Sequence, residues 1–398
     1  MYDWKRIAAA GGLAALLFAP AIVSAAPKAS PMDLIKTIKE IGPEGNGNSE
    51  AGKAWRALVE SGPDALPTIL AAFKGADDRK INWLQTAVDA IAEKELAAGR
   101  SLPAEKLESF VRDTKHSGRG RKAAFDLLVR VDPKSPERLL PGFLDDPGLE
   151  MRREAVAHAL ADGARLVEKK DNDAAVAAYR KLLASARDED QVEEIAKRLK
   201  KLNVEVDLAA HFGFIRDWAL VAPFDNVGGI GFKTAFPPEK SVDLNAVYKG
   251  KKDADISWIA HSTKDPHGLV DLNKALGKFK GATAYAFATV ESPEERSVEI
   301  RAGCITALKI FLNGQEIFAR EEYHHGMEID QHVGRGKLKA GRNEILIKVC
   351  QNEQTEPFAQ VWQYQVRVCD NLGGAVPVKV VRPQIKEERK PTEGKVNP

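Results

Sequence analysis

The spacing of hydrophobic residues divides the chain into a helical part and a strand-rich part. From residue 53 to about residue 202, apolar residues, mostly Ala and Leu, recur at the three- and four-residue intervals of helices with one buried face. Beyond residues 202–206 the chain changes to short alternating stretches separated by Gly, Asn, Asp and Pro, which are typical of strands and turns. We therefore expect a helical domain at residues 53–205 and a strand-rich domain at residues 206–382.

The helical part contains an internal repeat. Leu-Pro pairs begin at Leu66, Leu102 and Leu140, at spacings of 36 and 38 residues, and a period of this length with paired helices is typical of helical solenoids. Residues 55–70 resemble a HEAT repeat, and residues 174–183 resemble a tetratricopeptide (TPR) helix. We expect stacked helical hairpins in a HEAT/TPR-like solenoid, with an irregular helical bundle as the alternative.

The strand-rich part contains two hairpin signals. Leu and Ile alternate with other residues along 308–312, directly before Asn313 and Gly314, a pair that tolerates the positive φ angles of a two-residue hairpin turn. A second alternating stretch covers residues 345–349, and apolar and aromatic residues of 358–368 share one face of a late strand. Because a single sheet could not bury so many apolar faces, we expect a two-sheet sandwich.

These hairpins also carry a family resemblance. Residues 308–317 and 338–349 resemble the galactose-binding-like jelly roll, as in the non-catalytic sugar-binding domain of family 2 glycoside hydrolases. The whole chain, including residues 218–224 and 236–240, is similar to a group of exported planctomycete proteins. The resemblance implies a jelly-roll β-sandwich that contacts a glycan, although such domains vary widely in ligand. The expected fold class is thus α+β multidomain, an N-terminal helical-repeat solenoid followed by a C-terminal jelly roll.

The N-terminus has the pattern of a secretory signal peptide. Lys5 and Arg6 precede an apolar run at residues 7–23, and small residues follow. We expect cleavage after Ala25, so that residues 1–25 are removed and the mature protein is periplasmic or secreted, without stable membrane insertion. An uncleaved anchor is the alternative, although the run barely reaches the ~20 residues that span a bilayer.

The segments outside the two domains are expected to form a linker and a tail. Residues 26–52 contain a Pro/Ser stretch, a short helical pattern and a loop rich in Gly and Asn, which together predict a linker with a short helix. Residues 383–398 are polar, charged and proline-bearing, and we expect them to form a disordered tail.

The composition is that of a globular protein with nearly balanced charge. Hydrophobic residues make up 44% and charged residues 29% of the 398 residues, and 59 basic residues against 57 acidic ones give a net charge of +2. Since the two signs are interleaved, nucleic-acid binding is not expected. Cys304, Cys350 and Cys369 allow at most one disulfide, and without a C-x-x-C motif they do not predict a zinc site. No cofactor is expected.

The densest polar cluster occupies residues 321–332. Strand alternation would place His324, Glu328, Asp330 and His332 on one face, where imidazole and carboxylate groups could hold a divalent metal. Their spacing matches no zinc signature, so a solvated loop and a ligand contact are the alternatives. A second, weaker group of candidate ligands lies near Trp258 and comprises His261, Asp265 and His267.

Aromatic side chains are the expected platforms for a glycan, because the apolar face of a sugar ring stacks on Trp or Tyr. Trp362 and Tyr364 share a strand face with apolar residues and are interpreted as core, as is Trp218. Trp258 and Tyr323 lie beside polar clusters and are expected to be exposed. The candidate ligand-binding residues are therefore Trp258, Tyr323, His324, Asp330 and Asn313.

The sequence contains no recognisable catalytic motif. There is no G-x-S-x-G elbow and no phosphate-binding Gly-Lys-Ser/Thr, and the glycine-rich residues 228–231 lack a strand-to-helix context. We expect a non-catalytic exported binding protein, whose sandwich contacts a glycan or cell-envelope polymer and whose helical repeats hold a protein partner. A structural scaffold without a small ligand is the alternative, followed by a glycan-active enzyme or its accessory subunit.

Overall fold

A computed structural model describes residues 29–385 of the chain. These residues form two compact units, of which unit 1 ends at Pro133 and unit 2 begins at Lys134. The predicted signal peptide, and the predicted tail from residue 386 onward, lie outside the described residues. Between residues 29 and 385, no helix combines the length and the hydrophobicity needed to cross a membrane.

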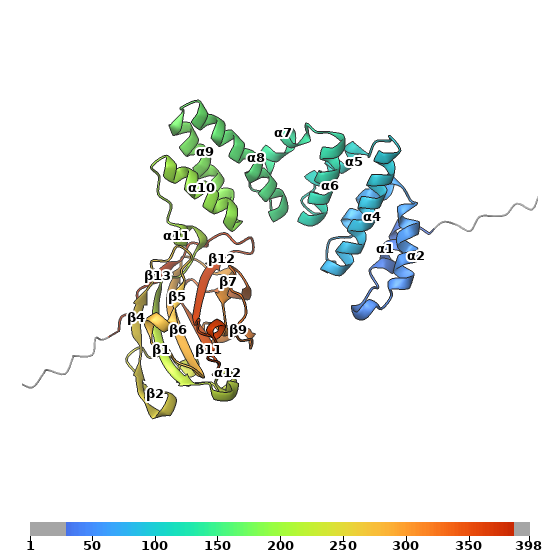
Figure 1. Cartoon of the computed structure of the whole chain (residues 1–398). Helices are drawn as coiled ribbons and strands as arrows, with labels where there is room; N and C mark the ends of the chain where they lie inside the picture. Colours follow the sequence, from blue (N-terminus) through green and yellow to red (C-terminus); the bar gives the residue numbers. More distant parts are fainter. Residues whose placement is uncertain (1–28, 386–398) are drawn as a thin grey trace, which may run out of the picture. The chain divides into compact units, whose positions relative to one another are not determined.

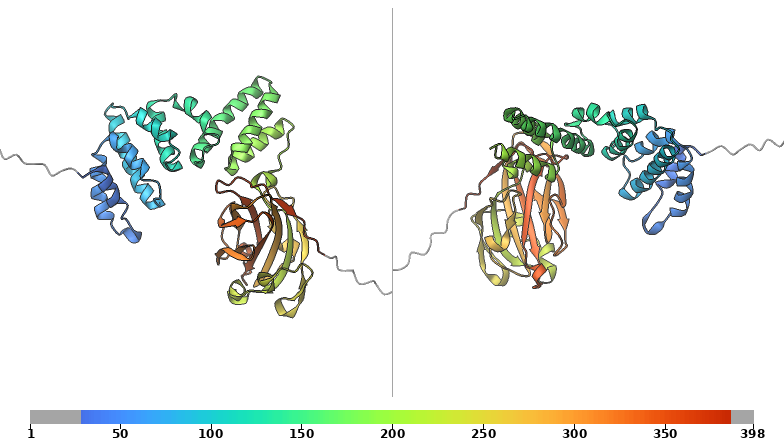
Figure 2. Two further views of the ribbon diagram at one scale, coloured as in Figure 1. Left: turned by 180° about the vertical axis from the view of Figure 1, so that it is seen from behind. Right: turned by 45° about the horizontal axis from the view of Figure 1, so that its top comes forward.

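Unit 1 is helical, and its helices follow one another in chain order (Figure 1; Figure 2). Ser30, Asp77 and Ser117 start three of them, because each side chain accepts a hydrogen bond from the backbone N–H three residues further on. The apolar positions of the helical pattern, such as Leu84 and Val88, are fully buried. The helices are α1 (Pro31–Ile38), α2 (Asn48–Val59), α3 (Leu66–Ala71), α4 (Asp78–Ala97), α5 (Ala104–Arg112) and α6 (Gly118–Val131). The predicted helical N-terminal region is therefore confirmed.

Unit 2 begins with further helices that share a core with the start of the strand-rich part. Tyr179 and Ile195 of these helices pack in one apolar cluster with Phe212 and Phe214. The change of periodicity at residues 202–206 therefore lies inside unit 2. The helices are α7 (Ser135–Leu139), α8 (Leu149–Glu168), α9 (Asn172–Ser185), α10 (Glu189–Lys201) and α11 (Leu208–Phe212).

The remainder of unit 2 consists mainly of antiparallel sheets, as the alternating pattern predicted (Figure 1). The larger sheet has the strand order β4-β1-β6-β11-β8-β9, with β13 also paired to β6. The smaller sheet has the order β10-β7-β12-β5, and β2 pairs only with β3. The strands are β1 (Asp217–Asp225), β2 (Val247–Lys249), β3 (Asp255–Ser257), β4 (Ile259–Ser262), β5 (Val270–Asp271), β6 (Ala282–Ser292), β7 (Arg296–Cys304), β8 (Ala307–Leu312), β9 (Gln315–Arg320), β10 (His332–Leu338), β11 (Gly341–Gln351), β12 (Gln363–Cys369) and β13 (Lys379–Val381). Short helices α12 (Ile230–Lys233), α13 (Pro237–Lys240) and α14 (Leu272–Ala275) lie between strands.

The two larger sheets share one hydrophobic core. Trp218, Trp362 and Tyr364 are fully buried in it, which confirms their interpretation as core residues. Apolar side chains from alternate positions of both sheets complete this core, as the two-residue period of a strand requires. The three cysteines are buried free thiols.

The hairpin between β8 and β9 turns where the sequence predicted. Asn313 and Gly314 have φ angles of 52° and 81°, the positive values that a two-residue hairpin turn demands. The Asn313 side chain donates to Asn343 Oδ1 at 2.9 Å and accepts from the backbone of Glu344 at 3.0 Å. Asn313 therefore has a structural role that holds this turn against the start of β11.

Candidate functional site

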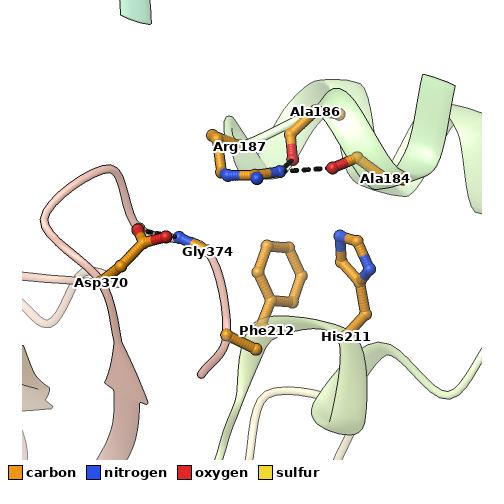
Figure 3. Close-up of a pocket in the computed structure, with 9 residues that line it drawn as sticks. Ala184, Ala186, Arg187, His211, Phe212, Asp370 and Gly374 are labelled. Atoms are coloured by element: carbon orange, nitrogen blue, oxygen red, sulfur yellow. Dashed lines mark hydrogen bonds between the residues drawn. The ribbon is translucent and has the colours of Figure 1, made fainter. Parts of the chain in front are cut away.

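A polar pocket of about 230 Å³ lies within unit 2, where the end of α9 meets α11 and the loop after β12 (Figure 3). Its walls come from three segments that are far apart in the sequence. The lining residues are Ala184, Ala186, Arg187, His211, Phe212, Asp370, Gly373, Gly374 and Ala375.

Arg187 forms one wall and is held by the end of α9. Its Nη1 donates to the carbonyl oxygens of Ala184 at 2.7 Å and Ala186 at 2.8 Å (Figure 3). Carbonyl groups in the last turn of a helix have no partner inside the helix, and a cation there also interacts favourably with the helix dipole. The guanidinium is therefore fixed in the pocket wall by two hydrogen bonds to the helix end.

The charge of Arg187 is incompletely compensated. Its Nε is buried and has no hydrogen-bond partner among the described residues. Burial lowers the pKa of Arg187, and the neighbouring guanidinium of Arg152 lowers it further, while Asp370 and Asp145 act in the opposite direction. Arg152 itself donates to the carbonyl of Ser185 at 3.3 Å. Two guanidinium groups thus converge on one helix end.

Helix α11 supplies the opposite wall. The rings of His211 and Phe212 face Arg187 across the pocket (Figure 3), and α11 is capped by Gly213, which adopts a φ of 80°. Burial lowers the pKa of His211, and the charges of Arg187 and Arg367 lower it further. The lowered pKa favours the neutral form of the imidazole, which offers one donor and one acceptor.

The loop after β12 forms the third wall. Asp370 Oδ1 accepts from the backbone of Leu372 at 2.8 Å and of Gly374 at 2.9 Å, which folds the loop into a tight turn. A Cβ at position 374 would lie 3.0 Å from Arg187 Nε and 3.1 Å from Asp370 Oδ2. The backbone of Gly374 therefore packs close to both the guanidinium and the carboxylate, an approach that a side chain at this position would obstruct.

Behind the pocket, Arg367 forms hydrogen bonds with two of these walls. Its Nη1 donates to the carbonyls of Phe212 at 3.1 Å and Gly373 at 2.8 Å. Asp330 accepts from Arg367 Nε at 2.6 Å and from Arg301 Nη1 at 2.7 Å. Although burial by itself raises the pKa of the Asp330 carboxyl, the hydrogen bonds and charges of Arg367 and Arg301 hold that pKa below its ordinary value. Asp330 is therefore an ionised positioning residue behind the pocket.

The expected exposure of Trp258 is wrong. Its side chain is 2% exposed and its Nε1 donates to the Tyr248 hydroxyl at 3.1 Å. Trp258 packs edge-on against Phe287 in a second apolar cluster, on the outer face of the larger sheet. Residues 226–258 supply part of this cluster and cover that face of the sheet. The polar neighbours of Trp258 in the sequence could not indicate that this segment buries it.

Tyr323 and His324 lie in the irregular segment before β10. The Tyr323 hydroxyl is half-buried and accepts from Asn226 at 3.2 Å, and burial raises the pKa of Tyr323 to about 12. His324 Nε2 lies 2.5 Å from Asn352 Oδ1. Of the predicted ligand-binding residues, none lines the Arg187 pocket, and Asp330 reaches it only through Arg367.

The four candidate metal ligands do not share a strand face, because β10 begins only at His332. Both oxygens of Asp330 are engaged by arginines, and Glu328 lines a separate groove. His332 is buried between Phe318 and His325, and no hydrogen bond to either ring nitrogen is present among the described residues. These four side chains do not form a metal-binding group: within residues 29–385, none of them belongs to a set of three ligand atoms that lie within 4.8 Å of one another.

Sequence reasoning missed Arg187, His211 and Asp370. An arginine just after a helix is common on protein surfaces, and nothing in its neighbours indicates that its Nε is buried. The Gly373-Gly374 pair was a usable signal, because adjacent glycines often mark a close approach of backbone to another group. The pocket joins three distant segments, so only the tertiary structure brings it together.

Comparison with known proteins identifies no family. No protein-family model and no curated protein matches the chain. Among solved structures, a β-glucosidase from Kluyveromyces marxianus in complex with glucose aligns at 12% identity and a TM-score of 0.24, over 40% of this chain and 17% of that one. An anti-sigma factor domain-containing protein aligns at 13% identity and a TM-score of 0.22, over 36% of this chain and 50% of that one. The chain therefore spans at most half of either structure, and similarity at this level carries no argument about function.

Proposed function

We propose that this protein is a non-catalytic exported binding protein, and that unit 2 binds an acidic group of a glycan or cell-envelope polymer in the Arg187 pocket. The observation that carries the proposal is Arg187 in the pocket wall, whose buried Nε has no hydrogen-bond partner among the described residues. A buried donor without a partner costs roughly 1–3 kcal/mol. A carboxylate or sulfate group bound beside this guanidinium in the pocket would neutralise its charge.

The other lining groups favour an acid that also carries hydroxyls. Asp370 Oδ2 is an acceptor, the neutral His211 ring is both donor and acceptor, and the Phe212 ring offers an apolar face. A uronic acid residue combines a carboxylate, hydroxyls and an apolar ring face. Pockets for drug-sized ligands have volumes of about 300–1,000 Å³. At about 230 Å³, this pocket fits one sugar unit of a longer chain.

The same lining supports binding without catalysis. Asp370 is the one carboxylate among the lining residues, whereas most glycosidases use two across the scissile bond. No Ser or Cys lines the pocket. At the level of fold, we propose that the two sheets form a galactose-binding-like jelly roll and that the helical hairpins stack as a HEAT-like solenoid.

The test is a glycan array of neutral and acidic glycans, followed by calorimetric titration with the best acidic ligand. Arg187→Gln should weaken binding at least about tenfold, because a charge-assisted hydrogen bond is lost. The matched control is Arg180→Gln, which removes one exposed positive charge from helix α9, the helix that precedes Arg187. Neutral glycans that bind as strongly as acidic ones, or unchanged binding of the acidic ligand by Arg187→Gln, would contradict the proposal. Turnover of the glycan would favour the enzyme alternative, and no glycan binding at all would favour the scaffold.

A protein partner on unit 1 is a second proposed function, favoured by a groove of about 720 Å³ along α1, α3 and α5. Met32 is 64% exposed there, and Ile35, Ala71 and Phe110 are among its apolar lining residues. The charged lining residues are mostly basic: Lys36, Lys39, Lys74 and Asp33. Apolar surface beside a net positive charge fits an amphipathic peptide segment with acidic flanks.

A photo-crosslinking residue at position 32, introduced in the native host, tests this second function. The expected adduct is one envelope protein, joined through an acidic amphipathic segment, and a synthetic copy of that segment should bind the purified protein in calorimetry. The control crosslinker replaces Val167, an exposed apolar residue of unit 2. Adducts with a second copy of this chain, or the same adducts from both positions, would contradict the proposal.

A further inference from the structure

A separate cluster of ligand-type side chains lies where α10 faces the loop between β4 and β5. Glu189 and Glu193 are four residues apart on α10, so their side chains lie on the same helix face. His267 points at both, with its Nε2 3.4 Å from Glu193 Oε1 and 3.8 Å from Glu189 Oε1. The ligand atoms of the three residues all lie within 4.8 Å of one another.

These distances suit a metal ion better than a hydrogen-bonded ion pair. An N–H···O hydrogen bond has a donor–acceptor distance of about 2.7–3.2 Å, which both contacts exceed. Around a tetrahedral ion with bonds of about 2.0–2.2 Å, two ligand atoms lie about 3.4 Å apart. His267 Nε2 is moreover buried and has no hydrogen-bond partner in the described part of the chain.

The loop orients His267 rigidly. Asp265 Oδ1 accepts from the backbone of His267 at 2.8 Å and of Leu269 at 3.2 Å. The imidazole packs against the rings of Phe212 and Phe214, with ring centroids about 6 Å away. A metal site needs a ligand ring that is held in one orientation, and this loop provides it.

Helix α10 is fixed independently of the cluster. Arg153 pairs with Asp190 at 2.6 Å and its carbonyl accepts from Gln191 at 2.9 Å. Within residues 29–385, Glu189 and Glu193 form no ion pair with any group other than His267. Apart from this imidazole, no basic side chain within residues 29–385 pairs with either carboxylate.

We propose that Glu189, Glu193 and His267 bind a divalent transition-metal ion of the Zn²⁺ type, which would hold α10 against the β4–β5 loop. Two carboxylate oxygens and one imidazole nitrogen suit zinc better than Mg²⁺ or Ca²⁺, which take oxygen ligands. Glu189 also lines a groove of about 480 Å³ together with Met327 and Gln363. The groove gives the ion a path of entry and leaves room for a water as fourth ligand.

The experiment is a calorimetric titration of the chelator-treated full chain with ZnCl₂. The unsubstituted protein should bind one equivalent, and the site variants His267→Ala and Glu193→Gln should each bind at least about tenfold more weakly, since even the loss of an outer-shell partner costs 10–100-fold. The matched controls are His158→Ala and Glu205→Gln, another half-buried histidine and an exposed glutamate of unit 2. Arg187→Gln should bind zinc normally, which separates this site from the proposed glycan pocket.

Substitution by Co²⁺ gives a second readout. Co²⁺ should show the visible absorption of tetrahedral coordination without a thiolate charge-transfer band, because all three cysteines are buried. No zinc binding, stronger binding of Ca²⁺ than of Zn²⁺, or unchanged binding by Glu193→Gln with a native circular dichroism spectrum would each overturn the proposal. Glu193→Gln keeps the size and shape of the side chain, so its result stands even if His267→Ala fails to fold.

Discussion

At the scale of single residues, the Arg187 pocket depends on a side chain that is absent. Gly374 has no Cβ, and the position of that atom falls between Arg187 Nε and Asp370 Oδ2. The backbone of Gly374 does not adopt a positive φ, so the close contacts of a Cβ, rather than the backbone conformation, would oppose an alanine here. The glycine at this position therefore permits the loop backbone to approach Arg187 and Asp370 closely.

We predict that Gly374→Ala abolishes ligand binding while leaving the fold intact. The new methyl group would lie 3.0 Å from Arg187 Nε and displace the guanidinium, and the acidic glycans that we propose as ligands should bind at least about tenfold more weakly, a loss of about 1.4 kcal/mol or more. The melting temperature should change little, because Gly→Ala stabilises by about 0.4–1 kcal/mol through the unfolded state, which offsets the tighter contacts. Calorimetry and a thermal melt measure both effects. Gly142→Ala, where a Cβ meets nothing within 4 Å, is the control, and normal binding by Gly374→Ala would move the site elsewhere.

His332 makes stability depend on pH. Burial lowers the pKa of His332 to about 4, and the charges of His325 and Arg320 act in the same direction. The unfolded value is about 6.5, so between pH 6.5 and pH 4 the unfolded chain binds a proton that the folded chain does not. The contribution of His332 to stability is therefore complete above pH 6.5 and declines as the pH falls toward 4.

We predict that His332→Phe flattens this pH dependence. Between pH 7 and pH 5 the unsubstituted protein should lose on the order of 1–2 kcal/mol through His332 alone. The phenylalanine ring keeps the contact with Phe318 but cannot take up a proton. Urea unfolding at the two pH values gives the difference, with His158→Phe as control. An equal loss of stability in both proteins would show that His332 is not the group responsible.

At the scale of elements, local signals were readable in the sequence and contacts between elements were not. The turn at Asn313 and Gly314 was predicted because two adjacent residues determine it. Asp330 was predicted as a ligand contact from its polar neighbours, but its true partners, Arg301 and Arg367, lie 29 and 37 residues away. The prediction that Trp258 is exposed was wrong for the same reason, because tertiary packing places the segment that covers it.

We predict that Asp330→Asn loosens the junction of α11 with the loop after β12. The substitution leaves the guanidinium of Arg367 buried and uncompensated, and breaking one partner of a buried ion pair costs about 3–5 kcal/mol. Because Arg367 holds the carbonyls of Phe212 and Gly373, glycan binding should weaken as well. Chemical denaturation and calorimetry report the two effects. Asp173→Asn, an exposed residue of α9, should change neither, and an equally small effect of Asp330→Asn would mean that the carboxylate does not position the pocket.

At the scale of the whole molecule, the most visible change in the sequence does not coincide with the boundary between compact units. The periodicity changes at residues 202–206, yet unit 2 begins at Lys134. Helices α9 and α10 bury Tyr179 and Ile195 against Phe212 and Phe214, so these helices and the strand-rich part share one core. Periodicity reports the secondary structure of a segment, whereas a unit boundary depends on which segments bury each other's apolar surface.

We therefore predict that a fragment of residues 134–385 is more stable than one of residues 207–382. The shorter fragment loses the helices that cover Phe212 and Phe214, and exposing each buried apolar side chain costs roughly 1.5–3 kcal/mol. The two side chains together amount to roughly 3–6 kcal/mol. At about 2–4 °C per kcal/mol for a chain of this size, the melting temperature should fall by roughly 6–24 °C relative to the longer fragment. Thermal melts followed by circular dichroism compare the two fragments with residues 29–133 and with the full chain. If residues 207–382 melt as high as residues 134–385, the strand-rich part is self-supporting and the shared core contributes nothing to its stability. If residues 134–385 are unfolded while the full chain is folded, the boundary at Lys134 is itself wrong.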